Sequence, residues 1–133
     1  MGERRIGVAL SDEMGLLAFP LTTIFHSDMA GDVSAVLRIA QERDAKEIVV
    51  GLPLSLDGRR GPQALSVEKF VAALEKRTSI PIKTWDERFS TQDAQRLLQQ
   101  VGVKPSREKG RLDAASAAVI LQAYLDFQQR SHR

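Results

Sequence analysis

The sequence has no cysteine and only 2 histidines among its 133 residues. Without cysteine, neither a disulfide framework nor a thiolate metal site can form. The histidines, His26 and His132, are too few and too peripheral for histidine-based catalysis. A Walker A loop, a Gly-x-Gly-x-x-Gly loop and a Gly-x-Ser-x-Gly elbow are absent as well. The catalytic chemistry left to this chain is that of carboxylates.

The chain also lacks a run of about 18 apolar residues, and it does not open with a charged and then apolar leader. We therefore expect a cytoplasmic protein without a membrane partner. Hydrophobic residues make up 43% and charged residues 27% of the sequence, as in an ordinary soluble globular protein. A chain of this length buries a core without staples, so we expect a single domain over residues 1–133, either monomeric or homodimeric.

Basic residues are unevenly distributed, although the net charge is only +2. They gather at Arg4–Arg5, Arg59–Arg60, 104–111 and 130–133. A clustered basic surface on a nearly neutral protein suits a partner that carries phosphates, such as nucleic acid. The alternative is an ordinary solvated surface, above all for the last four residues, which resemble a frayed tail.

Hydrophobic periodicity predicts strands that alternate with helices. The strands 5–10 and 18–25 flank the turn residues 12–15 and should form an antiparallel hairpin. Residues 47–51 and a short stretch after Pro81 are the later strands. Because helices and strands alternate after the hairpin, the sequence favours an α/β sandwich with a mostly parallel core. The expected apolar helix faces are Val33, Val36, Leu37 and Ala40 (with Asp32 as cap), Val67, Phe70, Val71 and Leu74, Ala94, Leu97, Leu98 and Val101 (before a terminal Gly102), and Ala114, Ala117, Ala118, Leu121 and Leu125.

The stretch 80–91 places charged side chains between a strand and a helix. Asp86, Glu87 and Arg88 follow the strand, and the Ser90–Thr91 pair can cap the helix. Ligands of open α/β sheets bind beyond the carboxyl ends of the strands, so this is where we expect a site. The alternative is that the acids only complement the dipole of the helix.

Asp113 opens the last helix, directly after a basic loop. Carboxylates such as Glu87 and Asp113, converging at one edge of a sheet, can hold Mg²⁺ or Mn²⁺. Two such ions can activate a water and stabilise the leaving oxygen in phosphodiester cleavage. Lys109 and Arg111 can hold the phosphates of the scissile strand. Helix capping by Asp113 and simple solvation of the loop are the alternatives.

Four segments of the chain resemble the YqgF family: RIGVALSD (5–12), IVVGLPLSLDG (48–58), DERFST (86–91) and KGRLDAASAAVIL (109–121). The resemblance covers nearly the whole chain in the right order. Members of this family are bacterial pre-16S ribosomal RNA nucleases, also called Holliday junction resolvase-like proteins. The resemblance therefore implies a ribonuclease H-like fold, which is a three-layer α/β sandwich with a mixed sheet.

The same resemblance implies roles for individual residues. Glu87 and Asp113 would be the catalytic acids and the ligands of Mg²⁺ or Mn²⁺. The residues expected to bind the substrate are basic: Arg5, Arg88, Lys109 and Arg111.

A further acid that the family pattern requires has no counterpart in this sequence. Family members open with an apolar strand that ends in Asp-x-Gly; Gly2 matches that glycine and Met1 stands at x. The aspartate would then lie one position before Met1, and the first, central strand of the sheet would be missing from this chain. We expect the reading frame upstream of Met1 to encode about five to ten apolar residues ending in Asp.

The function implied first is a metal-dependent nuclease that processes the 5′ end of pre-16S ribosomal RNA during ribosome biogenesis. A DNA nuclease acting on branched junctions shares the same fold and chemistry. A nucleic-acid-binding factor without catalysis is the alternative from another class, because two carboxylates hold a metal pair less well than three.

Overall fold

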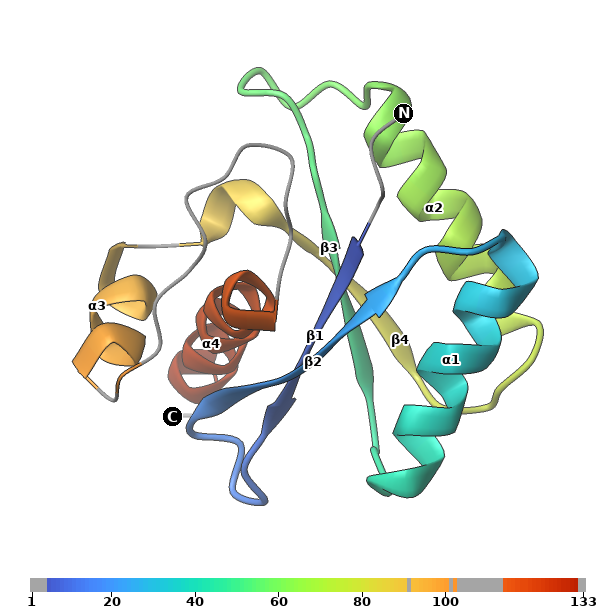
Figure 1. Cartoon of the computed structure of the whole chain (residues 1–133). Coiled ribbons are helices and arrows are strands. Elements are labelled where there is room, and N and C mark those ends of the chain that lie inside the picture. The colour runs from blue at the N-terminus through green and yellow to red at the C-terminus, as the bar shows by residue number, and fades with distance from the viewer. Residues whose placement is uncertain (1–4, 91, 101, 103–113, 132–133) are drawn as a thin grey trace. The chain divides into compact units, whose positions relative to one another are not determined.

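The computed structural model describes residues 5–90, 92–100, 102 and 114–131. Within these residues the protein is a mixed α/β structure whose strands form two separate two-stranded sheets. Figure 1 labels these strands and helices. The chain divides into two compact units. The first unit combines the residues up to Phe25 with those from Phe89 onward, and the second is His26–Arg88.

The elements follow one another in the order expected from the sequence. The strands are β1 (Arg5–Ser11), β2 (Ala18–Phe25), β3 (Ile48–Leu52) and β4 (Ile82–Asp86), the α-helices are α1 (Met29–Glu42), α2 (Pro62–Glu75), α3 (Gln92–Gln100) and α4 (Ala114–Ser131), and η1 (Glu87–Phe89) is a short 3₁₀-helix.

The hairpin β1–β2 opens the first unit and is antiparallel, as predicted. Its turn is closed by the Asp12 carboxylate, which accepts hydrogen bonds from the backbone N–H groups of Leu16 at 2.7 Å and Leu17 at 3.2 Å. Gly15 supplies the positive φ (+70°) that the turn requires. The register shifts between Val8 and Ala9, opposite Pro20. Since proline lacks a backbone N–H group, a bulge is where a strand can accommodate it.

Helix α4 packs against both strands of the hairpin, and Gln122 is the polar link between them. This side chain is fully buried. Its Oε1 accepts from the backbone N–H of Ala18 at 2.9 Å, and its Nε2 donates to the carbonyl of Leu16 at 2.9 Å and to Asp126 at 3.0 Å. One glutamine thus satisfies backbone groups of the hairpin that burial would otherwise leave unpaired.

Helix α3 packs on α4, and its predicted core residues Ala94 and Leu98 are both fully buried. Gly102 has φ of +91° and donates its N–H to the carbonyl of Gln99, which confirms its role as the terminal glycine. The predicted cap was the Ser90–Thr91 pair. Among the described residues, the buried Oγ of Ser90 has no hydrogen-bond partner, and Thr91 lies outside them.

The second unit is built on the parallel pair β3–β4, which extends from Ile48↔Ile82 to Leu52↔Asp86. Helix α2 packs on both strands, and α1 packs on α2. The predicted helix faces supply much of this core, although several of their members are only half-buried. The fully or nearly buried apolar side chains of this unit are Val33, Ala40, Ala64, Val71 and Leu74.

The start of α1 differs from the prediction, which had Asp32 as the cap. Asp28 is the N-cap, and its Oδ1 accepts from the backbone N–H of Gly31 at 2.7 Å. Asp32 lies instead within the first turn, 4% exposed, where its carboxylate contacts His26 Nδ1 and the backbone N–H of Ser27. Both aspartates are possible caps by residue type, and the helix simply begins one turn earlier.

The prediction of a mixed α/β fold is confirmed. The three-layer sandwich, the missing central strand and the single domain over residues 1–133 stay predictions. In the part of the chain that the structure describes, no helix is long and apolar enough to cross a bilayer.

We expect Gln122→Met, which preserves the shape of the side chain, to lower the free energy of unfolding by about 1–3 kcal/mol. The reason is that the buried N–H of Ala18 loses its acceptor. Gln129 is a matched control, because it lies on the same helix and donates to Gly15 in the same turn at 3.3 Å, but is exposed. Gln129→Met should change the stability by less than about 0.5 kcal/mol. Urea denaturation measures both values, and equal effects would contradict the importance of Gln122.

Candidate active site

The carboxyl ends of β3 and β4 lie at the same edge of their parallel sheet, with Leu52 opposite Asp86. From this edge the loop 53–61 leaves β3, and η1 leaves β4. Ligand sites of α/β sheets form at such edges, because loops with free side chains start there together. The charged motif Asp86-Glu87-Arg88 therefore occupies the position expected of a site.

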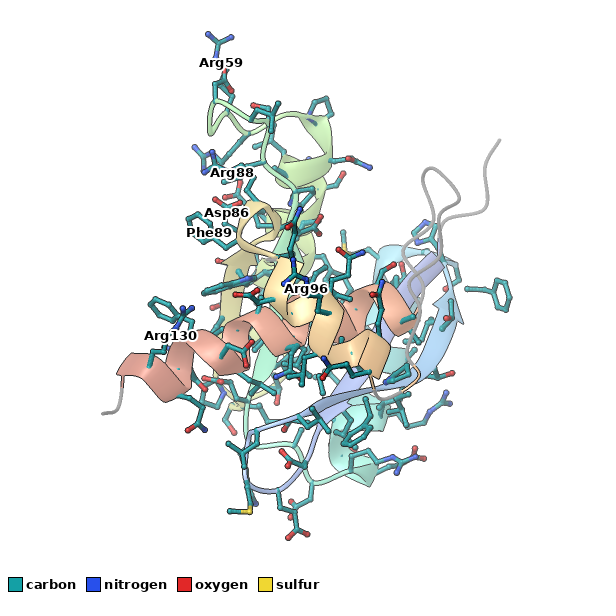
Figure 2. The ribbon with its side chains drawn as sticks, turned by 90° about the vertical axis from the view of Figure 1, so that its left-hand side faces the viewer. Arg59, Asp86, Arg88, Phe89, Arg96 and Arg130 are labelled. Atoms are coloured by element: carbon teal, nitrogen blue, oxygen red, sulfur yellow. The ribbon has the colours of Figure 1, made fainter. Side chains whose placement is uncertain are left out.

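Asp86 and Arg88 form an ion pair with several hydrogen bonds at this edge (Figure 2). Arg88 Nε donates to both carboxylate oxygens, at 3.1 and 3.0 Å, and Nη2 donates to Oδ2 at 2.6 Å. The backbone N–H of Arg88 adds a fourth hydrogen bond to Oδ1 at 2.9 Å. The Asp86 side chain is only 14% exposed, and the guanidinium beside it holds the pKa of this carboxyl below its usual range. Both oxygens of Asp86 are therefore committed to Arg88.

Glu87, the next residue, is in a different environment. Its side chain is half-buried, and burial raises the pKa of its carboxyl, with a further contribution from the negative charge of Asp86. Among the described residues, no cation or hydrogen-bond donor pairs with this carboxylate. A half-buried acid without a partner is costly when ionised, and a bound cation would compensate its charge. Glu87 is thus chemically suited to be the metal ligand of this edge.

Arg88 has a second partner beyond Asp86. Its Nη1 donates to the backbone carbonyl of Leu56 at 3.1 Å, across 32 positions in the sequence. The motif is therefore tied to the loop that follows β3. Sequence reasoning did not identify this contact, since a backbone carbonyl can belong to any residue type; only the Asp57-Gly58 pair signalled a turn there.

The structure does not place the side chains of the other predicted site residues. Lys109, Arg111 and Asp113 lie outside the described residues. Arg5 begins β1, where its backbone is paired with Phe25. Among the residues that are described, no group of three or more His, Asp and Glu side chains is placed to hold a metal. The proposed pairing of Glu87 with Asp113 stays a prediction.

Comparison with known proteins identifies relatives over nearly the entire chain. The family model RuvX, described as a Holliday junction resolvase, matches residues 1–127. A protein of Synechococcus sp. named "Putative pre-16S rRNA nuclease" is 44% identical over 133 residues, which is 100% of this chain and 89% of the relative. Proteins with the same name from Chloroflexus aurantiacus and Halothermothrix orenii are 42% and 37% identical, over 99% and 98% of this chain and 89% and 94% of their own lengths. The resemblance to the YqgF family is confirmed.

The raised pKa of Glu87 predicts the sign of a stability change. The folded state holds the proton of this carboxyl more tightly than the unfolded state, so ionisation costs stability once the pH exceeds the folded pKa. In EDTA at pH 7, Glu87→Gln should therefore raise the melting temperature. This gain should shrink as the pH falls through the glutamate range and vanish below the unfolded pKa.

The matched control is Glu75→Gln, which changes an exposed glutamate at the end of α2. Its effect on the melting temperature should be small at each pH. Scanning calorimetry over a series of pH values measures both variants. If Glu87→Gln melts at a lower temperature than the parent protein at pH 7, the hypothesis that ionised Glu87 destabilises the fold is contradicted.

Proposed function

Because the chain belongs to the RuvX (YqgF) family of Holliday junction resolvases, we propose that it is a metal-dependent nuclease that cleaves phosphodiester bonds in pre-16S ribosomal RNA. The names of the relatives support a nuclease and this RNA as the substrate. Processing of the 5′ end, a part in ribosome biogenesis and a location in the cytoplasm belong to the proposal.

The observation that carries the proposal is the contrast between two adjacent acids. Asp86 is ion-paired with Arg88, whereas Glu87 is half-buried with a raised pKa and without a partner among the described residues. Asp86 has the environment of a structural acid, because its hydrogen bonds to Arg88 lower its pKa and folding thereby stabilises its ionised form. Glu87 has the environment of a cation ligand, because a bound cation would compensate the charge of its half-buried carboxylate.

Mg²⁺ or Mn²⁺ would be held by Glu87 and Asp113. When bound, such ions activate a water and stabilise the leaving oxygen of a phosphodiester. The protein's own part is to supply hard oxygen ligands at the edge where β4 ends. Arg5, Lys109 and Arg111 would hold the phosphates of the strand being cut.

Branched DNA is the second candidate substrate, and the description of the family model as a Holliday junction resolvase favours it. Both substrates are phosphodiesters and require the same acids, so they differ in what the basic residues recognise. A nucleic-acid-binding factor without catalysis would need the cations and not Glu87.

Glu87→Gln should abolish cleavage of a pre-16S precursor RNA in Mn²⁺, by roughly 10³-fold or more, because a charged metal ligand is lost at nearly constant shape. Affinity for the same RNA, measured in Ca²⁺, should stay within a few-fold. The assay uses the protein as its gene encodes it, including any residues before Met1, and Glu75→Gln is the control. Cleavage by the Glu87 variant at the rate of the parent protein would rule out the proposed metal site.

The choice between substrates is read from the same preparation. We expect the precursor RNA to be cut and a four-way DNA junction to be left intact by the parent protein under identical conditions. Cleavage of the junction alone would favour the second candidate. Binding of the RNA without cleavage of either substrate would support the factor without catalysis.

Lys109→Ala combined with Arg111→Ala should weaken RNA binding and make it less dependent on salt. Each phosphate that a cation neutralises contributes about 0.7 to 0.9 to the slope of log affinity against log salt, so the loss of two cations should lower the slope by roughly 1.4 to 1.8. A salt titration in Ca²⁺ measures this slope. A slope equal to that of the parent protein would favour the alternative that Lys109 and Arg111 are ordinary solvated residues.

A further inference from the structure

The turn after β3 is closed by its own side chains. The hydroxyl of Ser55 donates to the Asp57 carboxylate, and the backbone N–H of Arg59 donates to Ser55 Oγ at 3.1 Å and to Asp57 Oδ1 at 3.2 Å. Backbone hydrogen bonds of 3.1 Å from Ser55 to Arg59 and 2.9 Å from Gly58 to Ser55 complete it, with Gly58 at φ of +86°. The hydrogen bond from the Ser55 hydroxyl, followed by that from the Arg59 backbone, holds the pKa of the Asp57 carboxyl below its usual value. The turn is therefore closed by hydrogen bonds of both its side chains and its backbone.

Arg88 fixes this turn to the end of β4. The guanidinium that grips Asp86 also donates to the Leu56 carbonyl at 3.1 Å, and Gly58 lies beside it, since a Cβ at that glycine would be 3.6 Å from Nη1. The planar fork of arginine can serve both partners at once, which the single ammonium of lysine cannot. The position of the turn relative to Glu87 thus depends on Arg88.

All side chains of this turn are exposed, and Leu56 is 95% exposed. The cation that the turn presents to solvent is Arg59. It is 86% exposed and extends from the tip of the loop, away from Asp86 (Figure 2). Its Nε is 2.9 Å from Asp57, but an exposed ion pair of this kind contributes little, so exchange of partner is inexpensive. Its neighbour Arg60 is paired with Glu68 at 3.1 Å. An ordered turn with a projecting guanidinium suits an anionic ligand, because little conformational entropy is left to lose on binding.

We propose that Arg59 binds a backbone phosphate of the RNA substrate and that Arg88 is the positioning residue that fixes the Ser55–Arg59 turn for this contact. This inference rests on the proposed function and deepens it. It replaces direct phosphate binding by Arg88 with an indirect role, because the guanidinium of Arg88 donates hydrogen bonds to Asp86 and to the Leu56 carbonyl. The ligand class is the phosphodiester backbone, without recognition of the base.

The positioning role is tested first without nucleic acid. Proteases cut a segment faster when it opens locally. If Arg88 fixes the turn, Arg88→Lys should therefore speed trypsin cleavage after Arg59 and Arg60 by about tenfold. Arg77→Lys is the matched control, since Arg77 also donates to a backbone carbonyl in this unit, that of Ala30 at 3.4 Å. Arg77→Lys should be cut at the rate of the parent protein. If Arg88→Lys is also cut at the parent rate, the positioning role is overturned.

The phosphate contact is tested by binding of a single-stranded RNA that spans the 5′ boundary of the precursor, in Ca²⁺ at several salt concentrations. Arg59→Ala should weaken binding by about tenfold and lower the salt slope by about 0.7. Arg88→Lys should cause the same changes although it keeps its charge, and the double variant should lose no more than either single one. Arg38→Ala, which removes an exposed arginine from α1, is the control and should bind as the parent protein does.

The alternatives give different patterns. Direct phosphate binding by Arg88 would leave the salt slope of Arg88→Lys unchanged and make the two substitutions additive, which overturns the inference while the nuclease proposal stands. An unchanged slope in Arg59→Ala overturns it in the same way. Absence of RNA binding by the parent protein would overturn both the proposed function and the role of Arg59.

Discussion

The fork of hydrogen bonds from Arg88 is the constraint on which the candidate site depends. One guanidinium binds both oxygens of Asp86 and the carbonyl of Leu56, so it joins the end of β4 to the loop that follows β3. Charge-assisted hydrogen bonds with such geometry are the strong ones in proteins. By neutralising Asp86, the fork leaves Glu87 as the acid of this edge whose charge is not compensated by the described residues.

This division of roles connects stability with chemistry. A carboxylate that is half-buried beside another acid reduces the stability of the fold, which is common at sites that bind cations or move protons. The β3–β4 pair that precedes Glu87 packs against α2, whose Ala64 and Leu74 are fully buried. The strain is therefore confined to the end of a strand, where a ligand can relieve it.

Much of the fold follows from local patterns in the sequence. The hairpin could be predicted because its strand pattern and the residues Asp12 and Gly15 agree, and Gly102 was recognisable because helices commonly end at a left-handed glycine. The prediction of Asp32 as the N-cap of α1 was wrong, because Asp28 and Asp32 are equally good caps by residue type. The link from Arg88 to Leu56 could not be predicted, since it joins residues 32 positions apart through a backbone atom. The role of Glu87 was predicted from the family motif, whereas its burial became visible only in the structure.

The most direct test of this account is the affinity for Mn²⁺ of two variants that each remove one negative charge, measured by calorimetric titration of the protein as its gene encodes it. If Glu87 is the ligand and Asp86 serves Arg88, Glu87→Gln should weaken binding by about tenfold or more relative to Asp86→Asn, since a hard cation requires a charged oxygen that is not already engaged. Equal losses in the two variants, or a larger loss in Asp86→Asn, would contradict it.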